Sequence, residues 1–127
     1  MSDIRSPQAA SEDVSAKLHD LLTTLWARSR QTINERLDAL RMSLRSLRAN
    51  SGDAAARKSG GDAAHKLAGI LGTFGLPEGT EIARRIELML ESAAPLRAFD
   101  LEFLQTAIDQ LHQMIEAKSQ DAGKRRA

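Results

Sequence analysis

Large aliphatic residues recur three and four positions apart through most of this chain of 127 residues. The most regular run consists of Ile33, Leu37, Leu40, Leu44 and Leu47. This spacing puts side chains on one face of an α-helix, whereas a half-buried strand alternates apolar and polar residues. No stretch alternates in that way, and only 3% of the residues are aromatic. Leu and Ala carry the apolar content and favour helices, so the sequence predicts an all-α fold.

The first part of the chain is expected to form a first helix and a long second one, or a single bent helix. Ser11 suits the start of the first helix. The seam of apolar residues breaks between Trp26 and Thr32 and then resumes, which predicts either a break or a bend near residues 28–31. The run Asn50-Ser51-Gly52 ends the second helix, because glycine suits the position just past a helix end. The apolar residues of the first helix are Val14, Leu18, Leu21 and Leu25.

Three further helices are expected after residue 52. One spans about 53–74, unless the Ser59-Gly60-Gly61 run interrupts it and Asp62 caps a shorter helix. The sequence favours the longer helix. Pro77 suits the first turn of the next helix, and Asp100 is expected to cap the last one.

These helices predict one domain, an antiparallel four-helix bundle with an additional N-terminal helix. The bundle is expected to occupy residues 11–118. Residues 1–10 are interpreted as a flexible lead-in and residues 119–127 as a basic flexible tail. The bundle buries its apolar stripes within one chain, so we expect a monomer.

The composition excludes several classes of function. The sequence has no cysteine, which rules out disulfides and thiolate chemistry. No apolar run is long enough to span a membrane and no signal peptide is recognised, so the protein is expected to be cytoplasmic, with no membrane partner. Eighteen Lys and Arg residues balance 17 Asp and Glu, so the net charge indicates no nucleic-acid partner. The three histidines share no metal-ligand spacing, and neither a metal nor a cofactor is expected.

One histidine has unusual neighbours. On a helix, His65 points about 140° away from the centre of the apolar stripe that contains Leu67 and Leu71. The nearby positions on its own face include three glycines: Gly61, Gly69 and Gly72. A glycine inside a helix costs about 1 kcal/mol relative to alanine, so we infer that these glycines clear the surface for another protein. A neutral imidazole is a suitable nucleophile, and an exposed one on a rigid helix suits transient phosphorylation.

The run His65-Lys66-Leu67-Ala68-Gly69, followed by Gly72 and Gly75, resembles the signature of histidine-containing phosphotransfer (HPt) domains of bacterial two-component signalling. That signature is His-x-[Leu/Ile]-Lys-Gly. The run Gly72-Thr73-Phe74-Gly75 is similar to the phosphotransfer domain of the chemotaxis histidine kinase. The resemblance implies that His65 is the phosphoacceptor. The chain departs from the signature at Ala68, which stands where the family usually has lysine.

The resemblance also suggests residues that assist His65. Glu87 lies where the chemotaxis kinase carries a glutamate that hydrogen-bonds its histidine, although a plain surface acid is an alternative interpretation. A phosphorylated imidazole carries about two negative charges, which cations would stabilise. Because Ala68 cannot do so, we expect at least one of four residues to substitute, each of which could also be an ordinary solvated cation. They are Lys58, Lys66, Arg84 and Arg85.

The leading hypothesis is therefore a phosphorelay carrier. His65 would accept a phosphoryl group from a receiver domain or a histidine kinase and pass it to a second receiver, which would supply Mg²⁺. The sequence has no ATP-binding motif, so we do not expect an enzyme that turns over ATP alone. The absence of the usual lysine leaves open an adaptor that binds and inhibits a receiver or kinase without phosphorylation. A third possibility, a DNA-associated or oligomerising module, would use the stripe of Arg41, Arg45 and Arg48.

Overall fold

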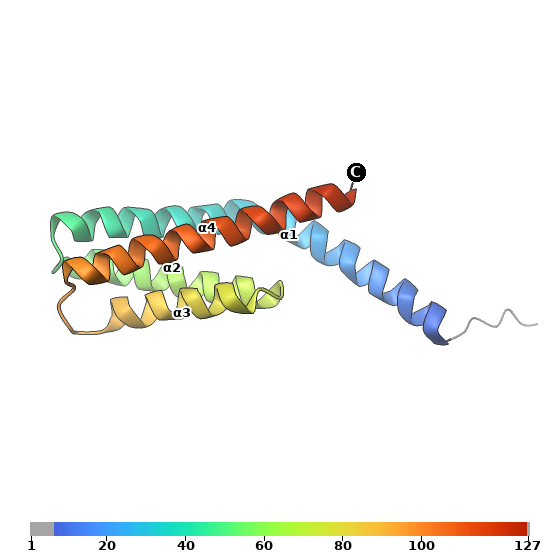
Figure 1. Ribbon diagram of the computed structural model, residues 1–127, viewed down its shortest axis with the longest axis horizontal. Helices are drawn as coiled ribbons and strands as arrows, with labels where there is room; N and C mark the ends of the chain where they lie inside the picture. The colour runs from blue at the N-terminus through green and yellow to red at the C-terminus, as the bar shows by residue number, and fades with distance from the viewer. Residues whose placement is uncertain (1–6, 127) are drawn as a thin grey trace, which may run out of the picture.

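The computed structural model describes the backbone of residues 7–126 and the side chains of residues 12–121. This part of the chain forms four helices and no strand. In Figure 1, α1 and α4 lie along one side of the bundle and α2 and α3 along the other, while the start of α1 extends beyond it. The helices are α1 (Pro7–Ala49), α2 (Ala54–Thr73), α3 (Pro77–Glu91) and α4 (Ala98–Arg126).

Helix α1 is one continuous helix that bends where its start leaves the bundle (Figure 1), so the single bent helix is the predicted alternative that the structure adopts. The additional N-terminal helix is not a separate element. The 43 residues of α1 include the segment where the apolar seam breaks. At that level Trp26 is buried and its ring packs edge-on against Phe74 at the end of α2, with 5.1 Å between ring centroids. Arg30, one turn later, binds Glu116 of α4 at 2.9 Å. Where the run of aliphatic residues is interrupted, a buried aromatic side chain and an ion pair thus connect α1 to its neighbours, and the helix continues without a break.

Two helices extend past the predicted bounds of the bundle, since residues 7–10 belong to α1 and residues 119–126 to α4. The flexibility expected for the two ends of the chain stays a prediction. Residues 1–6 and residue 127 lie outside the described residues. The apolar stripe near the start of α1 remains uncovered, with exposures between 38% and 65% for Val14, Leu18, Leu21 and Leu25.

The ends of α2 and α3 follow from local chemistry. The carboxylate of Asp53 accepts a hydrogen bond from the Ala56 amide at 3.0 Å, which caps α2. The helix then runs to Thr73 without interruption, as the longer of the two predicted helices. Gly75 has a φ of 71°, a conformation that glycine adopts without strain, and Pro77 begins α3.

The start of α4 differs from the prediction. Helix α4 begins at Ala98, two residues before Asp100, so Asp100 is not its cap residue. Its carboxylate instead reaches back and accepts a hydrogen bond from the Arg97 amide at 2.9 Å. An acidic side chain in the first turn satisfies a free amide in this way and interacts favourably with the helix dipole.

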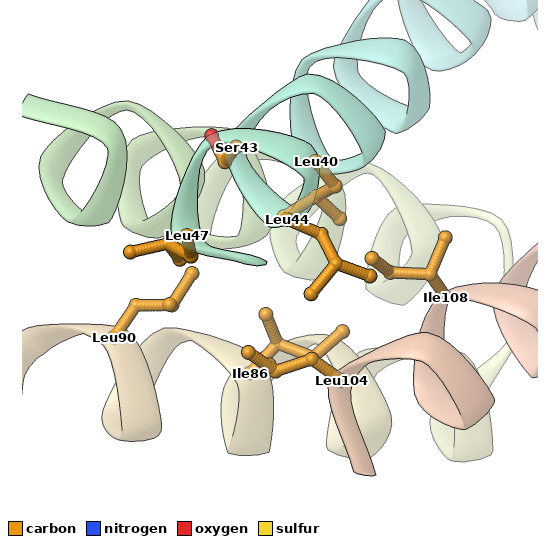
Figure 2. A pocket seen from close by; sticks show the side chains of 8 residues that line it. All are labelled: Leu40, Ser43, Leu44, Leu47, Ile86, Leu90, Leu104 and Ile108. Carbon is orange, nitrogen blue, oxygen red and sulfur yellow. The ribbon is translucent and has the colours of Figure 1, made fainter. Parts of the chain in front are cut away.

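The core lies between the four helices and is closely packed. Figure 2 shows leucines of α1 meeting Ile86 and Leu90 of α3 and Leu104 and Ile108 of α4. The void among them has a volume of only about 10 Å³, at the lower limit for one water molecule. This void therefore offers no room for a ligand.

Candidate phosphoacceptor site

His65 lies near the middle of α2 and points outward, with 73% of its side chain exposed. The opposite face of the same helix carries Ala64, Leu67 and Leu71, each fully buried in the core. The helix is thus held by its apolar face while the imidazole stands in solvent. This arrangement gives a partner protein access to a ring that sits on a rigid support.

Glu87 of α3 holds one nitrogen of this ring. Nδ1 of His65 lies 2.7 Å from Oε2 of Glu87, whose side chain is only 17% exposed. An ionised carboxylate only accepts hydrogen bonds, so we assign the proton to Nδ1. Nε2 then keeps its lone pair and faces solvent, as a nucleophile requires.

Three contacts define how α2 and α3 are aligned beside the site. A Cβ atom on Gly61 would lie 3.7 Å from Glu91 Cγ, and one on Gly72 would lie 3.3 Å from Thr80 Oγ1. The pair of His65 and Glu87 lies between these two contacts. Moving forward along α2 therefore corresponds to moving backward along α3, and the two helices are antiparallel.

Thr80 fixes this alignment one turn beyond the histidine. Its hydroxyl donates a hydrogen bond to the carbonyl oxygen of Ala68 at 3.1 Å. Thr80 was not identified from the sequence as a residue of the site, although its spacing from Glu87 could have indicated it. Thr80 lies two helical turns before Glu87, so a side chain at either position reaches the same edge of α2.

The three glycines near His65 have different surroundings, which corrects the expectation that all of them clear the surface. Gly61 is buried against the end of α3, and Gly72 faces Thr80. Gly69 is open, because a Cβ atom there would meet nothing within 4 Å. Gly72 is exposed as well, so of the three glycines only Gly61 is covered, and the surface is most open at Gly69, one turn after His65.

Ala68 lies only about 60° round the helix from His65, yet it is buried. It is only 5% exposed and lies in the contact between α2 and α3. The position that usually holds a lysine in the resembling family is thus enclosed by its neighbours. An alanine fits that space without carrying any charge to the site.

The structure brings none of the four predicted cations into a hydrogen bond with His65. Lys58, Lys66, Arg84 and Arg85 are all exposed. Arg85 pairs with Glu81 on its own helix at 3.0 Å. Their predicted role in binding phosphate stays a prediction, which the alignment of the helices makes more specific below.

Lys58 lines an open groove of about 440 Å³ between α2 and the end of α3. Asp62 and Glu91 line the same groove, so its charges are mixed. At its end Arg57 donates hydrogen bonds to the carbonyls of Leu90 and Ala94, at 3.1 and 3.0 Å. No pattern in the sequence indicates this contact, because it depends on the tertiary arrangement of two helix ends.

The arginine stripe of α1 is partly engaged within the chain. Arg48 binds Glu102 of α4 at 3.1 Å, and Arg41 binds Asp38 at 3.2 Å. Two of the three arginines that could follow a nucleic-acid backbone therefore already contact a carboxylate.

A comparison with protein families matches residues 20–121 to the Hpt domain. The chain belongs to the Hpt domain family. The match covers α2, α3 and most of α1 and α4, and it includes His65, Glu87 and the turn between α2 and α3. Membership assigns the chain to histidine phosphotransfer in two-component signalling, where Hpt domains serve as phosphocarrier modules that interact with kinases and receiver domains. Searches of curated proteins and of solved structures gave no match.

Within residues 7–126, no helix is both long and apolar enough to cross a membrane. Among the described side chains, no group of three or more His, Cys, Asp or Glu residues could hold a metal ion.

Proposed function

We propose that this Hpt domain relays a phosphoryl group between two-component partners, with His65 as the phosphoacceptor. The observation that carries the proposal is the hydrogen bond between Nδ1 of His65 and Glu87 at 2.7 Å. It gives an exposed ring a fixed tautomer and orientation. A nucleophile presented in one orientation loses less entropy on reaction than one that rotates freely.

The transfer step conserves charge and needs no proton movement. The lone pair on Nε2 attacks the phosphorus of an aspartyl phosphate on the receiver. The N–P bond forms while the P–O bond breaks, and its electron pair leaves with the receiver's carboxylate. The imidazole becomes positively charged, because Nδ1 keeps its proton, and the carboxylate of Glu87 stabilises that charge. Transfer to a second receiver reverses these events.

In this proposal the partner supplies the remaining chemistry. The receiver would bring Mg²⁺ and its own acidic pocket, while the Hpt domain brings a positioned nucleophile. Gly69 supports the approach of such a partner, because its open surface lies one turn from His65 and no contact within the chain requires a glycine there. We propose that the carrier acts in the cytoplasm. We also propose that it acts as a monomer, because the core between its four helices is complete within one chain, although the stripe at the start of α1 is uncovered.

The test is phosphorylation by a cognate partner with matched histidine variants. Purified protein is mixed with Mg²⁺ and a phosphorylated receiver or kinase, alongside His65→Gln and the control His112→Gln, an exposed histidine on α4. We expect acid-labile, alkali-stable label on the wild type and on His112→Gln, and none on His65→Gln. Equal labelling of His65→Gln would overturn the assignment.

A second candidate is an adaptor that binds a receiver or kinase without being phosphorylated. Ala68 favours it, because the usual lysine is absent and its place is buried. An adaptor would bind the same partner and remain unlabelled, and His65→Gln would leave its inhibition of that partner intact. Binding measured in parallel with labelling therefore separates the two functions.

A further inference from the structure

Phosphorylation creates a charge problem at His65. The phosphoryl group adds about two negative charges to a ring that already contacts the carboxylate of Glu87. Asp62 lies on α2 one turn before His65 and adds another negative charge to this surface. A cation close to the ring would offset this repulsion.

The arrangement of α2 and α3 excludes three of the four candidate cations. Lys58 lies two turns from His65, roughly 10 Å along the helix axis at about 1.5 Å per residue. Lys66 points about 100° further round α2, away from α3. Arg85 points about 160° away from Glu87 on α3 and is paired with Glu81 at 3.0 Å.

Arg84 occupies a different place. It lies three residues before Glu87, and side chains three apart on a helix are neighbours on one face. The contacts of Gly61 with Glu91, His65 with Glu87 and Gly72 with Thr80 fix the alignment of the helices. Interpolation between them puts Arg84 opposite Ala68, the position where the signature has lysine.

Arg84 is also available for an anion. Its side chain is exposed, and within the described part of the chain it has no acidic partner in an ion pair. The neighbouring surface of α2 is bare at Gly69, so no side chain there separates the guanidinium from a partner at the site.

We propose that Arg84 is the residue that stabilises the phosphoryl group on His65, supplying from α3 the positive charge that the usual lysine would supply from α2. This inference rests on the proposed function. The guanidinium would donate hydrogen bonds to phosphoryl oxygens, for which its planar arrangement of N–H groups is suited. Glu87 would bind the imidazole while Arg84 binds the phosphate, so one face of α3 would hold both halves of phosphohistidine.

The test uses phosphoramidate, a small phosphoryl donor that requires no protein docking. Nε2 attacks its phosphorus, the P–N bond breaks and ammonia leaves after taking up a proton from water. The rate of labelling and the hydrolysis rate of phosphohistidine are measured for the wild type, Arg84→Ala, Arg84→Lys and Arg85→Ala. Urea unfolding of each variant checks that the fold is unchanged.

We expect Arg84→Ala to slow labelling or to speed hydrolysis about three- to tenfold, as for the loss of a charge-assisted hydrogen bond at an exposed site. Arg84→Lys should recover most of the effect, and Arg85→Ala should match the wild type. The effect should shrink between about 0.01 M and about 1 M salt, because the screening length falls from roughly 30 Å to roughly 3 Å.

Two results overturn the inference in distinguishable ways. If the wild type is labelled at His65 and Arg84→Ala behaves like Arg85→Ala in both rates, Arg84 does not bind the phosphoryl group. If neither phosphoramidate nor a cognate partner labels the wild type, the proposed function is rejected and this inference with it.

Discussion

Gly60 of α2 packs so closely against Leu90 of α3 that a Cβ atom on residue 60 would lie 2.8 Å from Leu90 Cδ1. The same atom would lie 3.0 Å from the Cβ of Ser43 in α1. Three helices therefore converge on a residue without a side chain. Gly60, which together with Gly61 looks like a weak point of the helix in the sequence, is a packing requirement at a junction.

This contact predicts that Gly60→Ala destabilises the protein. Alanine is the better helix former by about 1 kcal/mol, but overpacking a core contact costs roughly 1–3 kcal/mol. We expect a net loss in the free energy of unfolding, measured by urea denaturation. An unchanged or increased stability would show that Ser43 and Leu90 yield more easily than their buried positions suggest.

The opposite result is expected for Gly69→Ala. A Cβ atom there meets nothing within 4 Å, so the substitution should stabilise the protein by about 0.5–1 kcal/mol through helix propensity. If the open surface serves a docking partner, the variant should accept phosphate from a receiver more slowly than the wild type. Labelling by phosphoramidate should stay the same, and a parallel fall in both rates would argue against a docking role.

Removing the carboxylate of Glu87 should affect the ring directly. In Glu87→Ala the proton is free to move to Nε2, and the positive charge on the phosphorylated ring loses its partner. We expect labelling to slow by about tenfold, comparable to the loss of an interaction of roughly 1.4 kcal/mol. Nitrogen NMR of the imidazole should report mainly the Nδ1–H tautomer in the wild type and a shift toward Nε2–H in the variant.

The sequence predicts the helices better than it predicts how they meet. Apolar periodicity indicated the all-α fold, α2 begins close to the predicted residue 53, and α3 begins at the predicted Pro77. Each of these is a local property of the chain. The choice between a break and a bend in α1 was left open by the sequence, because it depends on Trp26 and Arg30 finding partners in Phe74 and α4.

The candidate site also combines features that local sequence predicts with features that depend on how the helices pack. The outward direction of His65 follows from helix geometry, and its pairing with Glu87 was suggested only by a family resemblance. The burial of Ala68 and Gly61 depends on the alignment of α3 with α2, which no pattern within a single helix reveals. Helix periodicity assigns a residue to a face, and only the packing of the neighbouring helix decides whether that face is covered.

Arg57 is another residue whose role depends on packing, and it should contribute to stability. Its guanidinium donates hydrogen bonds to carbonyls at the end of α3, including Leu90 and Met89 at 3.1 and 3.3 Å, and to the Ser92 carbonyl. These oxygens otherwise lack partners at a helix terminus, where positive charge is favourable. We expect Arg57→Met to lower the free energy of unfolding by about 2 kcal/mol in urea denaturation. Lys58→Met is the matched control and should change it by less than about 0.5 kcal/mol.

The ion pair between α1 and α4 predicts a dependence of stability on pH. Arg30 hydrogen-bonds the Glu116 carboxylate at 2.9 Å and holds its pKa below the usual range for glutamate. A lowered pKa in the folded state means that the pair stabilises the fold above the unfolded pKa, and that this contribution is lost as the pH falls through the folded pKa. Glu116→Gln should therefore be less stable than the wild type at pH 7. The difference in stability between the variant and the wild type should narrow below about pH 5, where carboxylates of the unfolded chain begin to bind protons.

Urea denaturation between about pH 3 and about pH 7 measures this difference in the free energy of unfolding. Glu12→Gln, on the exposed start of α1, is the control. A stability difference that stays constant down to about pH 3 would mean that Glu116 contributes through packing and not through its charge.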